Sequence, residues 1–231
     1  MANIIKNSYR HNVVNLLESC NGNVGVELGV AKGIFSLRMM ESGYFSYFFG
    51  IDAYADLHDV NEYKEVVNKI GLFSNYKLLR MTFDEAYDLF DDESLDFIYV
   101  DGYAHTGENG GKTIFDWSRK VKIGGVISGD DYHDDWPLVV EAVDEFVLLS
   151  GFNLNLTANV EDDPYCNYPS WAVIKDTDTC DMRPSEQLLK KGHRAKRPRK
   201  KLLSLVVGYL HKDIVNWLKK EKQVVKLVVV F

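Results

Sequence analysis

Residues 26–33 read Val-Glu-Leu-Gly-Val-Ala-Lys-Gly, a pattern typical of a buried strand, a glycine turn and the start of a helix. Glycine accepts positive φ at such a turn and lets the backbone approach a ligand closely. The N-terminus of the following helix then points N–H groups at that ligand. The spacing Glu-x-Gly-x-x-x-Gly differs from the Gly-x-Gly-x-x-Gly of dinucleotide-binding proteins. A carboxylate before the loop would repel a pyrophosphate, but it would attract the ammonium group of a methionine moiety.

Short apolar runs alternate with amphipathic segments on both sides of this loop, as far as residue 175. We expect strands at 24–28, 47–51, 76–79, 95–100, 125–128, 152–156 and 171–174. We expect helices at 32–41, 61–70, 84–90, 112–120 and 136–150. This alternation predicts an α/β fold, a Rossmann-like, doubly wound and mostly parallel sheet of seven strands.

An acid follows the second expected strand at Asp52. A carboxylate in this position can accept hydrogen bonds from both ribose hydroxyls of a nucleoside. The alternative is a structural glycine turn with two incidental carboxylates. Asp52 taken together with Glu27 and Gly29 favours a cofactor site.

Charge divides the chain into an acidic body and a basic tail. Residues 1–185 contain 14 Lys and Arg against 31 Asp and Glu, whereas residues 186–231 contain 13 against 3. We expect one domain at 1–175, a polybasic linker at 176–201 and a C-terminal amphipathic helical segment at 202–231. An acidic body would repel phosphate, so no nucleic-acid partner is expected.

The basic tail has three interpretations. It packs on the domain, it contributes to a homo-oligomer, or it attaches the chain to an anionic membrane surface or an acidic protein partner.

The three cysteines, Cys20, Cys166 and Cys180, are too few and too far apart in the sequence for a disulfide framework, and their spacing is not that of zinc ligands. With no apolar run typical of a secretion signal or a membrane span, we expect a cytoplasmic protein.

Two further segments suggest a family. Residues 96–102 read Asp-Phe-Ile-Tyr-Val-Asp-Gly, and residues 124–132 read Gly-Gly-Val-Ile-Ser-Gly-Asp-Asp-Tyr. With residues 26–33, they resemble class I S-adenosylmethionine-dependent methyltransferases. Within that class they resemble the macrocin-type sugar and small-molecule O-methyltransferases, and catechol-type enzymes more distantly. The resemblance covers about residues 20–175 and implies S-adenosylmethionine as cofactor. The expected cofactor-binding residues are Glu27, Gly29, Gly33, Asp52, Thr82, Phe83 and Asp101.

Three carboxylates follow the fourth and fifth expected strands: Asp101, Asp130 and Asp131. Neighbouring parallel strands lie about 4.8 Å apart, so these side chains can converge at the edge where ligands bind. Such a cluster normally holds Mg²⁺ or Mn²⁺, which would bind the acceptor hydroxyl and lower its pKa. The resembling enzymes place metal ligands at these three positions. The alternative is that Asp130 and Asp131 only cap the next helix and that Asp101 is a solvated loop acid.

The base is expected at His105, with His133 as its rival and Asp101 as a further catalytic residue. The commoner family pattern is Asp-Gly-Asp-His, whereas here Tyr103 takes the place of the second acid.

From the resemblance as a whole we predict metal-assisted O-methylation of a sugar hydroxyl, on a deoxyhexose or rhamnose-type glycan or glycoside. The alternatives are a catechol-like small-molecule O-methyltransferase and a non-catalytic binding module of the same fold. Residues 107–111 form either a lid or a simple connection.

Overall fold

The computed structural model describes residues 2–18, 22–55, 58–159 and 167–196. The strands are β1 (Asn3–Ile5), β2 (Asn23–Leu28), β3 (Phe45–Ile51), β4 (Tyr76–Leu79), β5 (Leu95–Val100), β6 (Val121–Gly129), β7 (Asn155–Thr157) and β8 (Trp171–Ile174). The α-helices are α1 (Ile34–Ser42), α2 (Val60–Ile70), α3 (Phe83–Tyr87), α4 (Gly107–Gly110), α5 (Lys112–Ser118) and α6 (Pro137–Ser150). There are also two 3-10 helices, η1 (Arg10–Leu16) and η2 (Ala104–Thr106), and residues 186–196 are helical.

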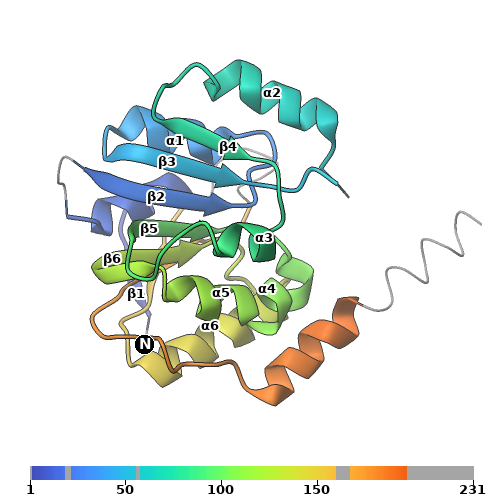
Figure 1. Cartoon of the computed structure of the whole chain (residues 1–231). Helices are drawn as coiled ribbons and strands as arrows, with labels where there is room; N and C mark the ends of the chain where they lie inside the picture. The colour runs from blue at the N-terminus through green and yellow to red at the C-terminus, as the bar shows by residue number, and fades with distance from the viewer. Residues whose placement is uncertain (1, 19–21, 56–57, 160–166, 197–231) are drawn as a thin grey trace, which may run out of the picture. The chain divides into compact units, whose positions relative to one another are not determined.

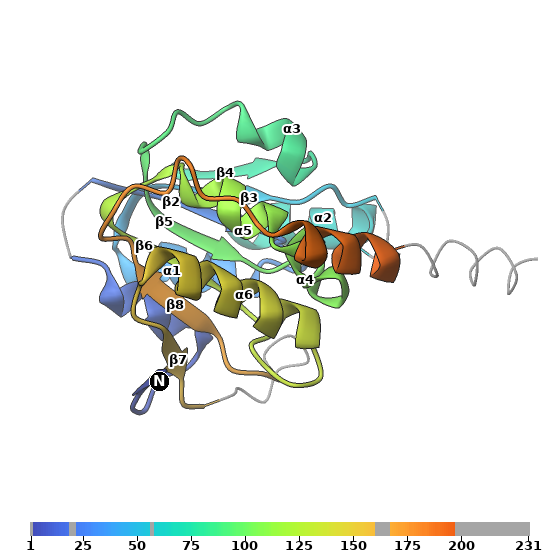
Figure 2. The ribbon, with the colours of Figure 1, turned by 90° about the horizontal axis from the view of Figure 1, so that it is seen from below.

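The strands form one mixed sheet with the order β1-β7-β8-β6-β5-β2-β3-β4. β8 runs antiparallel to both of its neighbours, and the remaining pairs are parallel. Helices cover both faces of the sheet (Figures 1 and 2). The arrangement is the Rossmann-like α/β fold that the alternation of strands and helices predicts.

Alternate residues of the central strand β5 pack into opposite layers. Phe97 and Tyr99 belong to the core that contains α1, α2 and η1, whereas Ile98 and Val100 belong to the core that contains α5 and α6. All four side chains are buried. A strand buried on both faces reads as a continuous apolar run, and this is why the sequence pattern indicates it.

The sheet differs from the expected one at its edge. It has eight strands among the described residues rather than seven, because β1 pairs in parallel with β7, with Asn3 opposite Asn155. β1 is three residues long and mostly exposed, so it has too little hydrophobic pattern to be recognised. β6 also begins earlier than expected, at Val121. It continues through Gly124, whose φ of +88° lets the strand bend where the register against β5 shifts.

The compact unit extends from Met1 to Gly192, so the domain boundary expected at residue 175 falls inside it. Ser185 donates hydrogen bonds to Glu145 on α6, Lys191 pairs with Glu141 on the same helix, and Leu188 is buried. The first part of the expected polybasic linker is therefore a packed element of the domain. Residues 193–231 form a second unit. Of the expected linker and amphipathic segment, residues 197–231 lie outside the described residues.

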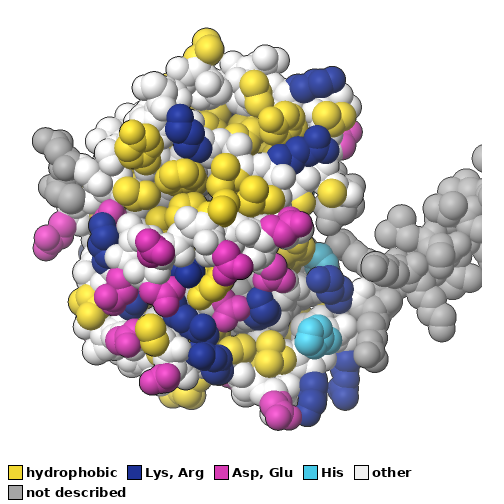
Figure 3. Space-filling view, viewed as in Figure 1, with side chains coloured by type: hydrophobic (Ala, Val, Ile, Leu, Met, Phe, Trp, Pro, Cys, Tyr) yellow, Lys and Arg dark blue, Asp and Glu magenta, His cyan; other side chains and the backbone are white. Residues whose placement is uncertain are grey.

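The surface carries few features that bear on function. Figure 3 shows hydrophobic side chains gathered over the part of this face where α2 and β4 lie. Val67 on α2 is exposed, as are Leu72 and Phe73, which follow this helix. Among the residues that the structure describes, no helix has the length and apolar character needed to cross a bilayer. Cys180 is a free thiol, and the other two cysteines lie outside the described residues.

Candidate active site

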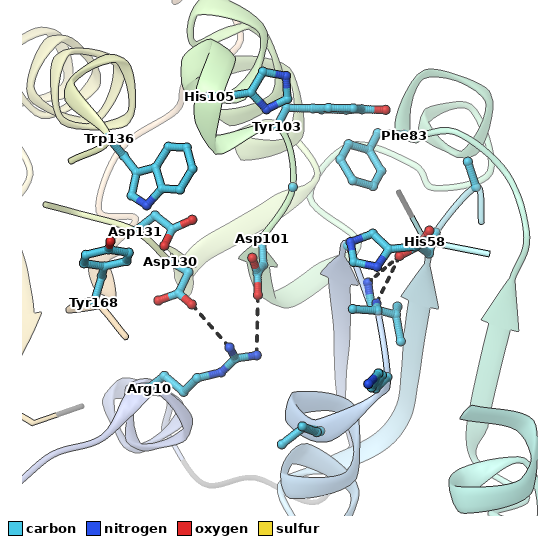
Figure 4. Close-up of a pocket in the computed structure, with 18 of the residues that line it drawn as sticks. Arg10, His58, Phe83, Asp101, Tyr103, His105, Asp130, Asp131, Trp136 and Tyr168 are labelled. Atoms are coloured by element: carbon cyan, nitrogen blue, oxygen red, sulfur yellow. Dashed lines mark hydrogen bonds and ion pairs between the residues drawn. The ribbon is translucent and has the colours of Figure 1, made fainter. Parts of the chain in front are cut away.

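A pocket of about 430 Å³ opens where the carboxyl ends of β2, β3, β5 and β6 meet (Figure 4). Ligands of open α/β sheets bind at this edge. One end of the pocket is formed by the loop after β2, by Asp52 and by Phe83. The other end is formed by Asp131, Trp136 and Tyr168, and Arg10, Asp101 and Asp130 lie between the two ends.

Asp52 organises the loop after β2. One of its carboxylate oxygens accepts hydrogen bonds from the backbone N–H groups of Val30 (3.0 Å) and Ala31 (3.1 Å), and the other accepts from the N–H of Tyr54 (2.9 Å). Each carboxylate oxygen has two lone pairs, so the side chain retains acceptor capacity toward the pocket. The loop and the acid are therefore one preorganised unit, built from residues close in the sequence.

Gly29 brings this unit against the end of β5. Its φ is +94°, and a Cβ atom at this position would lie 1.6 Å from the carbonyl oxygen of Asp101. Only glycine satisfies both conditions. The two loops that line the pocket are thus in direct backbone contact at Gly29.

Two of the expected cofactor residues do not line the pocket. Glu27 is buried beneath the loop, where its carboxylate accepts a hydrogen bond from Ser36. Burial raises the pKa of Glu27 to about 8, and the Ser36 hydroxyl and Arg10 oppose this rise only in part. Glu27 is therefore a mostly protonated core residue rather than a surface anion. Gly33 is the N-cap of α1 and packs against Val66.

Thr82 and Phe83 line the pocket as expected. The Thr82 hydroxyl accepts from the Glu85 N–H in a capping box that begins α3. The Phe83 ring packs edge-on against Tyr103, with ring centres 5.1 Å apart. Of the other aromatic residues near these motifs, Tyr54 donates to the carbonyl of Ala31, and it is not among the lining residues.

Arg10 is the residue that the sequence patterns missed. Its side chain is only 7% exposed, and its guanidinium contacts the carboxylates of Asp101 (3.4 Å) and Asp130 (3.3 Å) (Figure 4). The guanidinium also lies over the rings of Phe35 and Tyr99, 5.2 and 5.6 Å from their centres. Burial lowers the pKa of Arg10, but Tyr99, Asp101 and Asp130 together raise it above its ordinary value. Arg10 is therefore a permanent cation in the middle of the site.

The carboxylates around Arg10 have raised pKa values. Burial, followed by the charge of Asp130, raises the pKa of Asp101 to about 7. Burial, followed by the charges of Asp130 and Asp101, raises the pKa of Asp131 to about 8. Burial also raises the pKa of Asp130, whose second oxygen accepts a hydrogen bond from Ser170 (2.8 Å). Asp101 and Asp131 therefore exchange protons near neutral pH.

The side chains around Asp101, Asp130 and Asp131 do not fit the metal site that the sequence predicts there. Within the described part of the chain, no group of three or more His, Cys, Asp or Glu side chains is arranged to hold an ion. The guanidinium of Arg10 lies between two of the three expected ligands and neutralises the charge that a metal would neutralise. Arg10 precedes the first strand that the sequence predicts and belongs to no motif, so nothing in the pattern pointed to it.

The two expected histidines have different positions. His105 lines the pocket from η2, directly after Tyr103, whose φ is +49°. His133 does not line it. Its side chain is 43% exposed, lies 3.5 Å from Asp135 and packs against the ring of Tyr168. Of the two histidines, only His105 is placed to meet a ligand in the pocket.

The far end of the pocket has a polar group without a partner. The indole Nε1 of Trp136 is buried and has no hydrogen-bond partner among the residues that the structure describes. Figure 4 shows this ring beside Asp131 and Tyr168, facing the pocket.

The segment 107–111 was expected as a lid or a connection. It forms α4 and the C-cap of that helix, and it packs against α6, with Glu108 only 2% exposed.

The comparisons with known proteins agree with this geometry. A family model described as a methyltransferase domain matches residues 26–132. No curated protein matches the chain in sequence.

Several solved structures have a similar fold. A precorrin-6y C5,15-methyltransferase from Geobacter metallireducens is 17% identical, with 70% of this chain and 83% of that chain covered and a TM-score of 0.50. A putative O-methyltransferase from Klebsiella pneumoniae is 16% identical, over 72% of this chain and 79% of that chain, with a TM-score of 0.53. An S-adenosylmethionine-dependent O-methyltransferase from Thermotoga maritima is 13% identical, over 75% of this chain and 68% of that chain, with a TM-score of 0.53. At these identities the likeness shows a shared fold. Residues 26–132 therefore match a methyltransferase domain, and the solved neighbours, one of which is an S-adenosylmethionine-dependent O-methyltransferase, share the fold.

Proposed function

We propose that this chain is an O-methyltransferase that methylates a hydroxyl group of a small neutral acceptor, a sugar of the deoxyhexose or rhamnose type in the first place. The proposal rests on one observation. A single pocket joins the Gly29–Asp52 loop unit to a polar and aromatic end that contains Asp131, Trp136 and Tyr168. A methyl donor and an acceptor need adjacent sites of this kind for in-line transfer.

The loop end of the pocket fits the cofactor. The loop after β2, which lines the pocket from Gly29 onward, and the remaining acceptor capacity of Asp52 would hold the nucleoside, with Phe83 beside the base. The carboxylates of the pocket suit a ligand with an ammonium and a sulfonium group. When bound, S-adenosylmethionine supplies an activated methyl group on sulfur. As the acceptor oxygen forms its bond to the methyl carbon, the carbon–sulfur bond breaks and its electron pair stays on sulfur.

The acceptor hydroxyl must lose a proton in this reaction, and Asp131, which lines the pocket, is the base in this proposal. Its pKa of about 8 is close to working pH, which is the condition for an efficient general base. The Trp136 N–H would donate a hydrogen bond to the acceptor, and the Trp136 and Tyr168 rings would stack on it. His105 is the rival base. No divalent metal takes part in this scheme, because Arg10 supplies the positive charge.

The aromatic end of the pocket also favours a second acceptor class. The rings of Tyr103, Trp136 and Tyr168 would stack on a catechol-like ring no less favourably than on a sugar. The pocket acids disfavour carboxylated and phosphorylated acceptors of either class. A panel of neutral glycosides and catechols, each with its phosphorylated counterpart, separates these acceptor classes.

The first test is calorimetric titration of the full chain with S-adenosylmethionine and with S-adenosylhomocysteine. We expect micromolar binding of both, followed by formation of S-adenosylhomocysteine with a neutral hydroxyl acceptor. An absence of binding for both compounds would contradict the proposal, and the chain would then be a non-catalytic module of this fold.

The second test addresses the base. Asp131→Asn should lower kcat/KM by about 10²-fold, because proton transfer by a positioned group contributes 10²–10⁴-fold. In the wild type kcat/KM should rise as the pH passes about 8, because Asp131 acts in its deprotonated form, and this rise should be lost in the variant. Asp134→Asn, an exposed neighbour, is the matched control. A retained rise in Asp131→Asn, together with its loss in His105→Gln, would transfer the role to His105.

A further inference from the structure

Three acids converge at the carboxyl ends of β5 and β6, and a buried arginine accompanies them. Asp101 and Asp130 both contact the guanidinium of Arg10, at 3.4 and 3.3 Å. Asp131 is close enough to both acids for their charges to raise its pKa. Without a cation, three acids in one buried place would repel one another or remain protonated.

The environment of Arg10 is built for a fixed cation. The guanidinium faces the rings of Phe35 and Tyr99 in addition to the two carboxylates, and both rings are almost fully buried. Rings and carboxylates both stabilise a planar cation. On the opposite side of Asp130, Ser170 donates to the second carboxylate oxygen and is itself within 2.9 Å of the Tyr99 hydroxyl. Ser170 and Tyr99 therefore hold Asp130 turned toward Arg10.

The position of Arg10 has chemical consequences. A divalent metal at this edge would need oxygen atoms from Asp101 and Asp130, and those oxygen atoms face the guanidinium (Figure 4). Arg10 cannot lose its proton at any ordinary pH, so it does not leave the site as a neutral group. A metal would have to displace a buried charge that has little access to water.

We propose that Arg10 is the resident cation of this site and that its guanidinium takes the place of a divalent metal among Asp101, Asp130 and Asp131. The chain then binds no divalent metal there, and the carboxylates stay in place without one. This inference goes beyond the proposed methyl transfer, because it concerns the charge balance of the pocket and needs neither cofactor nor acceptor. Its failure and the failure of the proposed function are therefore distinguishable.

The experiment is a titration of the full chain with Mn²⁺, in which the electron paramagnetic resonance signal of free Mn²⁺ measures binding. The wild type should bind no Mn²⁺ in the pocket at millimolar metal. Arg10→Gln removes the charge and leaves the three acids together, so it should gain one Mn²⁺ site with an affinity at least about tenfold above that of the wild type. The double variant Arg10→Gln with Asp130→Asn should lose that site again. Arg38→Gln, which changes an exposed arginine on α1, is the matched control.

Two results would overturn the proposal. One is stoichiometric Mn²⁺ binding by the wild type that Asp130→Asn abolishes. The other is a folded Arg10→Gln variant that gains no Mn²⁺ site, because Arg10 would then not be what keeps the metal out. If Arg10→Gln does not fold, the wild type decides the matter. An equal melting temperature in Mn²⁺ and in chelator supports the proposal, and a higher one in Mn²⁺ that Asp130→Asn removes overturns it.

Discussion

The two ends of the pocket hold their acids in different ways. Asp52 accepts hydrogen bonds from backbone N–H groups that lie within 22 residues of it in the sequence. Asp130 is held by Arg10, which lies 120 residues away, and by Ser170, which lies 40 residues away. The first end is a local structure that a motif can describe. The second end exists only after distant parts of the chain have met, so its chemistry is a property of the fold.

The largest expected effect comes from breaking the long-range end. Arg10→Gln should lower the free energy of unfolding by about 3–5 kcal/mol, because it leaves buried carboxylates without their partner. Urea unfolding of the wild type, Arg10→Gln, Asp130→Asn and the double variant measures this effect. The double variant should lose at least about 1 kcal/mol less than the sum of the two single variants. Additivity within about 0.5 kcal/mol would show that the two side chains are not coupled.

A smaller effect is expected at the local end. Asp52→Asn keeps one carbonyl oxygen as an acceptor and loses the charge, so we expect a loss of about 1–2 kcal/mol in the free energy of unfolding. The affinity for S-adenosylmethionine should fall with it, because the Val30 and Ala31 N–H groups lose their anchor. Unfolding and calorimetry on the same samples measure both quantities. The exposed Asp91→Asn is the control. An unchanged affinity would show that the loop keeps its shape without Asp52.

The two ends of the pocket also differ in how well they can be predicted from the sequence. Gly29 and Asp52 were predicted at the loop and the strand end because turn glycines and strand-terminal acids are local features. The buried strands were predicted as well, since their apolar runs are nearly continuous. Arg10 was not predicted, because a single arginine before the first recognisable strand reads as a surface residue. The sequence predicts a metal for a related reason, because the carboxylates are visible in the pattern and their cationic partner is not.

Glu27 shows the limit of motif reasoning on the local side too. Its position in the Glu-x-Gly segment predicts a cofactor contact, and in the structure its side chain is 1% exposed and accepts a hydrogen bond from Ser36 on α1. Side chains of a strand alternate between faces, and a one-residue difference decides whether an acid meets the ligand or the core. A motif gives the residue type and the spacing, while the direction of the side chain depends on the strand register.

The third expected effect concerns Glu27 and pH. Its pKa is raised from 4.5 to about 8 in the folded chain, so the folded state binds more protons than the unfolded state between these values. The contribution of Glu27 to stability is therefore present at pH 4.5 and lost as the pH rises to 8, with a slope of at most about 1.4 kcal/mol per pH unit. Glu27→Gln should reduce this fall in stability between pH 5 and 8, as measured by urea unfolding at each pH. Glu41→Gln, a change of an exposed residue on α1, is the control. Parallel stability curves for Glu27→Gln and the wild type would contradict the assignment.

The attachment of the N-terminal segment has a consequence for the order in which the molecule is completed during synthesis. β1 pairs with β7, and Ser8 accepts hydrogen bonds from the N–H groups of Ala158 and Asn159. The segment that contains Arg10 is made before its docking surface, which is among the last parts of the sheet to be made. The Gly29–Asp52 loop can assemble from adjacent chain, whereas contacts between distant residues form late. We expect a nascent chain that ends before Asn155 to form the Gly29–Asp52 loop while Arg10 is still undocked.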